Sequence, residues 1–153
     1  MKLKALQFIA EYFVFVGAGV VVLLVVKQDS IYDSVKMMGV LGVTIILLWI
    51  FGAALKYIIR KERPSGRLEN MVMRDRYTFP SMHALTLSAA SYYVFTHNVT
   101  LGVVMIGVTL LVLIARVQTR IHYISDMIAG CFIGILFTYF VIPYIERIIT
   151  VFI

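Results

Sequence analysis

Long uncharged apolar runs, separated by short charged segments, make up most of this chain of 153 residues. The runs reach the roughly 18–20 residues that a helix needs to cross the hydrocarbon core of a bilayer. Helices are expected throughout, because lipid offers no hydrogen-bonding partner to backbone N–H and C=O groups. Three of the predicted spans cover residues 5–26, 37–55 and 127–145.

The stretch between Arg76 and Arg116 contains 39 residues without a formal charge. A helix of that length would measure about 58 Å at 1.5 Å per residue, far more than the roughly 30 Å of the hydrocarbon core. His97 and Asn98 supply a turn near its middle. We therefore predict a tight hairpin of two further spans. Residues 1–153 are assigned to a single domain, a polytopic, all-α transmembrane helical bundle of about five spans.

The composition agrees with a multi-pass integral membrane protein. Hydrophobic residues make up 61% of the chain and charged residues 14%, whereas soluble domains have roughly 45–50% apolar residues. The net charge of +6 does not indicate a nucleic-acid partner, because the basic residues lie in short loops where lipid headgroups and phosphorylated substrates are the available anions. No basic helix or patch of basic and aromatic residues is present, so we exclude nucleic-acid binding.

One long polar segment, residues 58–79, interrupts the apolar pattern. Within it, residues 67–76 have the mixture of charged and apolar positions that is typical of a short amphipathic helix lying on the membrane surface. Several basic residues of the segment are interpreted as contacts to lipid headgroups: Arg60, Lys61, Arg67, Arg74 and Arg76.

Five crossings would place the N-terminus, this polar segment and the loop at residues 116–125 on the same side of the membrane. In that last loop, Arg116 precedes His122 by six positions and His122 precedes Asp126 by four. A fifth helix that begins near His122 would hold His122 and Asp126 on one face. The carboxylate could then hold the imidazole through one ring nitrogen and leave the other free to attack an electrophile.

Three sequence patterns occur in order: Lys56 with Arg63-Pro64, then Pro80-Ser81-Met82-His83, then Ala115-Arg116 with His122 and Asp126. They resemble the signature of the type 2 phosphatidic acid phosphatase superfamily, over about half of the chain. In that family a Lys and an Arg-Pro are followed by Pro-Ser-Gly-His, and then by Ser-Arg, His and Asp at the same spacings. Two positions depart from the pattern, because Met82 replaces the usual Gly and Ala115 replaces the usual Ser.

The resemblance implies a membrane phosphatase that works through a phosphohistidine intermediate. His122 would attack the phosphorus atom, Asp126 would orient the imidazole, and His83 would act as the general acid. The phosphoryl oxygens would be bound by Lys56, Arg63, Ser81 and Arg116. The resemblance implies neither a metal nor another cofactor. Fixed cations suit this chemistry, because a phosphoryl group in transfer carries dispersed negative charge.

A site at the membrane edge predicts an amphiphilic substrate with its phosphate in the interface. Polyprenyl diphosphate is the first choice, ahead of phosphatidate, phosphatidylglycerophosphate and a lipid A phosphate. An alternative from another class is a non-catalytic phospholipid-binding or transport protein that uses the basic loops. The sequence does not indicate an oligomeric state.

The side of the membrane that carries the site is left open. Eleven Lys and Arg residues lie on the side of the motifs and three on the other, and eight remain when the three presumed phosphate binders are removed. The positive-inside rule therefore favours the cytoplasm. The resemblance favours the outside, since many bacterial relatives face outward. The small size of the chain leads us to expect a prokaryotic cell membrane.

Gly130 and Gly134 follow Asp126 at intervals of four residues, on one face of the predicted fifth helix. We interpret them as a packing seam that lets a neighbouring helix approach closely. A groove for an acyl or prenyl chain is the alternative interpretation.

Overall fold

The structure, a computed structural model, describes residues 2–28, 30–64 and 77–152. The predicted amphipathic helix at residues 67–76 lies outside these ranges. Five helices follow one another: α1 (Lys2–Val26), α2 (Ile31–Ile59), α3 (Met82–His97), α4 (Val99–Gln118) and α5 (Ile124–Phe152). The described residues form no strand, and their β-pairing is an isolated bridge between Glu62 and Tyr77. The predicted all-α bundle is confirmed.

The predicted hairpin at His97 and Asn98 is present. The backbone N–H of Asn98 donates to the Val94 carbonyl at 2.8 Å and ends α3. The Oδ1 atom of the same Asn98 accepts from the Leu101 N–H at 3.0 Å and begins α4. One residue thus caps both helices, and this explains how a long uncharged stretch folds into two antiparallel elements.

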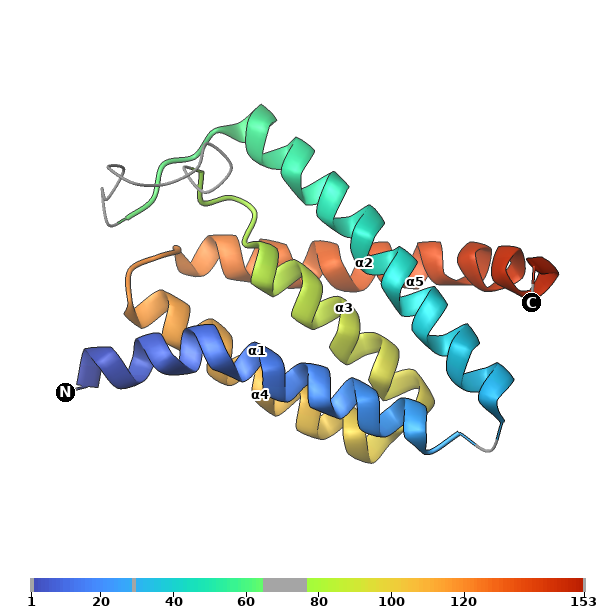
Figure 1. The fold of residues 1–153 in the computed structure, drawn as a ribbon. Coiled ribbons are helices and arrows are strands. Elements are labelled where there is room, and N and C mark those ends of the chain that lie inside the picture. Colours follow the sequence, from blue (N-terminus) through green and yellow to red (C-terminus); the bar gives the residue numbers. More distant parts are fainter. Residues whose placement is uncertain (1, 29, 65–76, 153) are drawn as a thin grey trace.

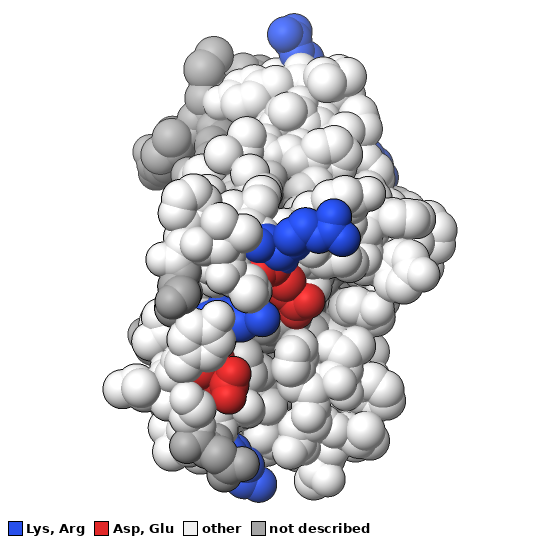
Figure 2. Space-filling view, turned by 90° about the vertical axis from the view of Figure 1, so that its right-hand side faces the viewer, with Lys and Arg blue, Asp and Glu red and all other residues white. Residues whose placement is uncertain are grey.

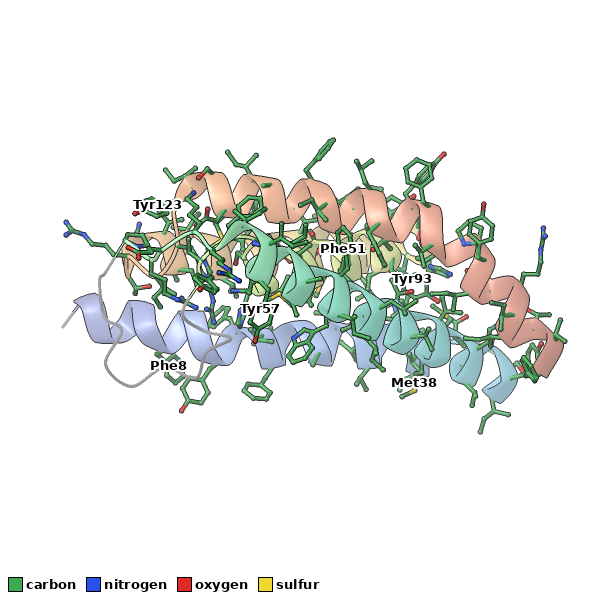
Figure 3. The ribbon with its side chains drawn as sticks, turned by 90° about the horizontal axis from the view of Figure 1, so that it is seen from above. Phe8, Met38, Phe51, Tyr57, Tyr93 and Tyr123 are labelled. Atoms are coloured by element: carbon green, nitrogen blue, oxygen red, sulfur yellow. The ribbon has the colours of Figure 1, made fainter. Side chains whose placement is uncertain are left out.

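Three helices, α2, α4 and α5, are long and apolar enough to cross a membrane. In α1, residues Tyr12–Val26 form a shorter apolar helix. Large apolar side chains are exposed all around the bundle, and Phe8, which projects away from α1 in Figure 3, is 56% exposed. An apolar surface of this extent is typical of a protein whose outer solvent is lipid.

Helix α3 is the centre of the bundle and packs against each of the other four helices. It has 16 residues, or about 24 Å at 1.5 Å per residue, and most of them are buried. Many are small, such as Ala84, Ala89 and Ala90. A helix that contacts protein rather than lipid needs small side chains for close approach more than it needs high hydropathy.

The three motif-bearing segments lie at one end of the bundle. In Figure 1 the N-terminus, the end of α2, the start of α3 and the loop from α4 to α5 all lie in the left half of the view. Figure 2 looks onto the opposite end, where acidic and basic side chains gather near the middle of a mostly uncharged face. Asp33, Lys36 and Glu146 line a hollow there. The predicted topology therefore brings the motifs together.

The glycines of α5 form a packing seam against α3. A Cβ atom at Gly130 would lie 2.7 Å from the Ala84 Cβ, and one at Gly134 would overlap the Ser88 Oγ and the Leu85 carbonyl oxygen. These distances leave no room for a side chain. The packing interpretation of the two glycines is confirmed.

We expect Gly134→Ala to destabilise the protein by about 1–3 kcal/mol, because the new methyl group must displace backbone of α3. Gly107→Ala is the matched control, since a Cβ there meets nothing within 4 Å and alanine gains about 1 kcal/mol of helix propensity over glycine. Thermal unfolding in detergent should show a lower midpoint for Gly134→Ala and an equal or higher one for Gly107→Ala. Equal midpoints for the two variants would contradict the seam.

Candidate active site

Hydrogen bonds join α2 and the residues that follow it to the residues that precede α3. Arg60 adopts a left-handed conformation with φ of 50° and donates its N–H to the Lys56 carbonyl, which ends α2. The chain then turns so that the Lys61 carbonyl accepts from the Thr78 N–H at 2.8 Å. Lys56, which is 3% exposed, donates its Nζ to the Tyr77 carbonyl at 2.8 Å. The first and second motifs therefore lie side by side.

Asp126 lies in the first turn of α5 and is fully buried. Its Oδ1 accepts from the Lys61 Nζ at 2.6 Å. Its Oδ2 accepts from the Thr78 Oγ1 at 2.6 Å and from the Tyr123 N–H at 3.1 Å. A buried carboxylate is stable as an anion when donors surround it in this way. We therefore treat Asp126 as ionised, so that it only accepts hydrogen bonds.

The Thr78 hydroxyl connects Asp126 with His122. Its Oγ1 lies 2.8 Å from the Nδ1 of His122. A threonine hydroxyl has one proton, and this proton goes to the acceptor-only Asp126. The Nδ1 of His122 must then carry a proton and donate it to Thr78. The hydrogen bonds thus select the Nδ1–H tautomer and leave a lone pair on Nε2.

Two expectations for this region were wrong. Helix α5 begins at Ile124, so His122 lies in the loop before it and does not share a helical face with Asp126. The expected direct hold of Asp126 on the imidazole is replaced by a relay through Thr78. The physical reason is that the Asp126 carboxylate turns back to the Tyr123 N–H at the start of α5, as acidic residues often do at a helix N-terminus.

His83 lies at the second position of α3 and contacts α4. Its Nε2 is 2.7 Å from an Nη atom of Arg116 in the last turn of α4. Arginine keeps its charge and only donates hydrogen bonds, so the Nε2 of His83 is the acceptor. His83 is therefore neutral in this state, with its proton on Nδ1.

His122 is 4% exposed and lies in a strongly cationic environment. Burial lowers the pKa of His122 to about 3, the charges of Arg63, Lys56 and Arg116 act in the same direction, and Asp126 opposes them. The positive charges of the same three residues also disfavour a positive charge on the His83 ring. His122 is therefore a neutral imidazole at physiological pH, with the unprotonated Nε2 that a nucleophile requires.

The remaining predicted residues also lie at this end of the bundle. An Nη atom of Arg63 donates to the Ile121 carbonyl at 3.3 Å, next to His122. Ser81 is fully buried and is the N-cap of α3, where its Oγ accepts from the Ala84 N–H at 3.4 Å. The structure thus brings together all seven residues singled out from the sequence: Lys56, Arg63, Ser81, His83, Arg116, His122 and Asp126. In Figure 3, nitrogen-bearing side chains crowd this end near Tyr57 and Tyr123.

The sequence interpretation missed two residues of the site. Thr78 precedes the second motif and has no feature that marks it as functional. Lys61 was interpreted as a headgroup contact, yet its ammonium pairs with Asp126, donates to the Ser125 hydroxyl at 3.0 Å and lies 4.6 Å from the centre of the Tyr123 ring. That interpretation was wrong, because chain reversal after Arg60 turns Lys61 toward α5. Lys61 lies five residues after Lys56, and this spacing alone did not reveal the turn.

Met82, which replaces the usual glycine of the second motif, packs between helices. Its side chain belongs to a cluster of α2, α3 and α5 residues that includes Leu48 and Leu85. A Cβ atom at Gly52 of α2 would lie 2.8 Å from the Met82 sulfur. The absence of a side chain at Gly52 therefore provides the space that Met82 occupies.

Within the described ranges, no three His, Cys, Asp or Glu side chains gather as metal ligands would. The charged groups around His122 and His83 are mainly Lys and Arg, which suit the binding of an anion.

We predict that His122 keeps a neutral, Nδ1-protonated ring from about pH 7 to about pH 5, because its pKa lies well below this range. Spectra of the ¹⁵N-histidine-labelled protein in micelles would show this, with His122→Ala to assign the signal. Added inorganic phosphate should raise the pKa of His122 by neutralising the nearby cations. A ring that is half-protonated near pH 6.5 without phosphate would contradict the proposed environment.

Comparisons with known proteins agree with the fold and with the motifs. A crystal structure described as the first transmembrane PAP2 type phosphatidylglycerolphosphate phosphatase, from Bacillus subtilis, matches with a TM-score of 0.61. The match covers 95% of this chain and 77% of that one at 18% sequence identity, which shows a shared fold. The model of the PAP2 superfamily matches residues 36–149, about three quarters of the chain. The match includes every motif residue named above, and the chain therefore belongs to the PAP2 superfamily.

Proposed function

We propose that this protein is a membrane lipid phosphatase that hydrolyses the phosphomonoester or diphosphate of a lipid. One observation carries the proposal. Thr78, which is itself hydrogen-bonded to Asp126, holds the Nδ1 of His122, so the opposite nitrogen, Nε2, is left without a proton and would act as the nucleophile. The cations that keep the ring neutral are also those that would bind a phosphoryl group. Membership of the PAP2 superfamily supports the same chemistry.

In the first step, the Nε2 lone pair of His122 attacks the phosphorus atom and the bond to the lipid oxygen breaks. The product is a phosphohistidine, whose ring carries a positive charge. The Nδ1–H of that ring stays hydrogen-bonded to Thr78, which in turn donates to the Asp126 carboxylate. The relay stabilises the new charge and prevents rotation of the ring.

The phosphoryl oxygens bind to the three cations, Lys56, Arg63 and Arg116. Arginine can give two parallel hydrogen bonds to a phosphate, while lysine acts as a compact point charge. The first backbone N–H groups of α3 have no acceptor within that helix. This helix end lies at the site, since His83 is its second residue and contacts Arg116. Its N-terminal dipole adds to the stabilisation of an anion.

His83 supplies the proton for the leaving oxygen. When substrate binds, Arg116 exchanges its hydrogen bond to His83 for one to a phosphoryl oxygen, and the Nε2 of His83 becomes able to take up a proton. The protonated His83 then donates to the lipid oxygen as the phosphorus–oxygen bond breaks. In the second step, neutral His83 takes a proton from water, the resulting hydroxide attacks the phosphohistidine, and phosphate leaves as His122 is restored.

The substrate class follows from the position of the site at one end of an apolar bundle, where a lipid headgroup would lie. Polyprenyl diphosphate is the proposed substrate, in a prokaryotic cell membrane, with a single domain formed by residues 1–153. Phosphatidate, phosphatidylglycerophosphate and a lipid A phosphate are the substrates to compare with it. The non-catalytic alternative, a phospholipid-binding or transport protein, would use the same cations without turnover.

We expect phosphate release from a lipid phosphate to fall by roughly 10³-fold or more in His122→Ala, since a nucleophile has no substitute. In His83→Ala the loss should be roughly 10²–10⁴-fold, as is typical of a general acid. A panel of the four lipid phosphates, assayed in micelles with and without a chelator, measures both effects. His97→Ala, at the opposite end of α3, is the control and should retain activity. Absence of release by the wild-type chain, or full release by His122→Ala, would favour the non-catalytic alternative.

The relay predicts that kcat depends on whether residue 78 carries a hydroxyl group. Thr78→Val preserves shape but removes the hydroxyl, so kcat should fall roughly tenfold to a hundredfold, the size of loss that follows when a hydrogen bond that orients a metal-bound histidine is removed. Thr78→Ser keeps the hydroxyl and should remain within about threefold of the wild type. KM should change little in either variant, because Thr78 does not bind the phosphoryl group. Similar kcat values for the Val and Ser variants would contradict the relay.

A further inference from the structure

Lys61 reaches from the end of α2 to the beginning of α5, where its ammonium group has three partners. It donates to the Asp126 Oδ1 at 2.6 Å and to the Ser125 Oγ at 3.0 Å, and it lies 4.6 Å from the centre of the Tyr123 ring. The Lys61 side chain is 35% exposed, whereas Asp126 is fully buried. The pair therefore joins a partly exposed cation to a buried anion.

The main chain of Lys61 also holds the residue that connects Asp126 with His122. The Lys61 carbonyl accepts from the Thr78 N–H at 2.8 Å, and the next residue, Glu62, forms the isolated bridge to Tyr77. Lys61 thus contacts both groups that precede His122 in the relay. Its backbone holds Thr78, and its side chain holds Asp126.

The two oxygens of Asp126 are divided between Lys61 and the relay. Oδ1 accepts from Lys61, while Oδ2 accepts from the Thr78 Oγ1 at 2.6 Å. Lys61 therefore acts on the oxygen opposite to the one that serves His122. Its influence on the imidazole passes through the carboxylate and involves no contact with the ring.

The charge of Asp126 has two opposing consequences for His122. Its hydrogen bond to Thr78 sets the tautomer of the ring, but its negative charge also favours a second proton there. Burial and the nearby cations lower the pKa of His122 to about 3, while Asp126 raises it. A doubly protonated ring has an N–H at both nitrogens and no lone pair on Nε2. The nucleophile therefore requires the acceptor oxygen of Asp126 without the full effect of its charge, and the Lys61 ammonium offsets that charge.

Other charged or titratable residues surround His122 and Asp126 from each neighbouring element: Lys56 and Arg63 from the side of α2, His83 of α3, Arg116 of α4 and Tyr123 before α5. The three cations among them act on the His122 ring itself, and a bound phosphoryl group would offset their charges. Lys61 differs because its partner is a carboxylate of the protein. Its effect on His122 is therefore present whether or not a phosphoryl group is bound.

We propose that Lys61 is a positioning residue for the nucleophile. Its ammonium holds Asp126 against Thr78 and offsets the charge of the carboxylate, so that the Nε2 of His122 stays free of a proton. The inference rests on the proposed function and adds to it a residue that controls the nucleophile through Asp126 and does not touch the substrate.

Neutral replacement of Lys61 should make His122 easier to protonate. In Lys61→Met, Asp126 loses its adjacent cation, so the carboxylate attracts a proton to the ring more strongly and the pKa of His122 rises, by about one unit or more. Spectra of the ¹⁵N-histidine-labelled protein in micelles at pH 4 measure this effect. They should show a mostly neutral His122 ring in the wild type and a ring that is at least half-protonated in Lys61→Met. Lys61→Arg keeps the charge and should resemble the wild type.

Arg60→Asn is the matched control, because it removes a positive charge from the adjacent position without touching Asp126. The exposed Arg60 side chain donates to the Tyr57 carbonyl of its own helix at 2.9 Å. Asparagine tolerates the left-handed backbone of this residue. The protonation of His122 in Arg60→Asn should match that of the wild type.

The same shift should appear in catalysis. The acid limb of kcat/KM for dipalmitoyl phosphatidate reports on the free enzyme. Its midpoint should move to higher pH in Lys61→Met and return to the wild-type position in Lys61→Arg. KM at pH 8 should change little, because Lys61 is paired with Asp126 and does not bind the phosphoryl group. A loss of kcat that is equal at every pH would indicate a purely structural role and overturn the assignment.

The outcomes separate this inference from the proposed function. If the wild-type chain hydrolyses no lipid phosphate, the phosphatase assignment fails, and the spectra still decide whether Lys61 keeps a proton off His122. Spectra that coincide for the wild type and Lys61→Met overturn the role of Lys61 alone, and so does an equal shift in Lys61→Arg or Arg60→Asn. Should Lys61→Met fail to fold, Lys61→Gln, which keeps an N–H donor without the charge, should show the same shift. Loss of the fold in both neutral variants, with Lys61→Arg folded, would overturn the proposal.

Discussion

The burial of the Asp126 carboxylate is the constraint on which the rest of the site depends. An isolated buried carboxylate would cost several kcal/mol, so its oxygens must find donors. Those donors come from three separate segments: Lys61 after α2, Thr78 before α3 and the Tyr123 N–H before α5. Satisfying one carboxylate therefore brings the ends of three helices together, and it does so at the end of the bundle where the motifs lie.

The same carboxylate reaches His122 through Thr78, while nearby cations act on the ring from other directions. The two influences have different effects. The relay decides which ring nitrogen carries the proton, and the cations, together with burial, decide that the ring stays neutral. A phosphoryl group is the ligand that changes this balance, since its negative charge offsets the cations and permits positive charge on the histidines. Under the proposed function, substrate binding and activation of the site would thus depend on the same charges.

Some features of the fold could be predicted because they repeat along the chain. Apolar runs and charged breaks indicated the helices, and the uncharged stretch with His97 and Asn98 near its middle indicated the α3–α4 hairpin. The beginning of α5 could not be located in this way, because Ile121, Tyr123 and Ile124 continue the apolar pattern of the helix across the loop. Thr78 and Lys61 could not be identified from the spacing of residues in the sequence. A hydrogen bond between residues 48 positions apart, such as that from Thr78 to Asp126, produces no periodic pattern along the chain.

The sequence by itself determined the class of the protein, the end of the bundle that carries its chemistry and the residue types gathered there. These follow from local composition and from the alternation of sides in successive crossings. The tertiary structure alone decided which groups touch. The relay through Thr78 and the pairing of Lys61 with Asp126 arise from segments distant in the chain. Such contacts depend on how helices pack and how loops turn, and these are properties of the whole bundle rather than of any one segment.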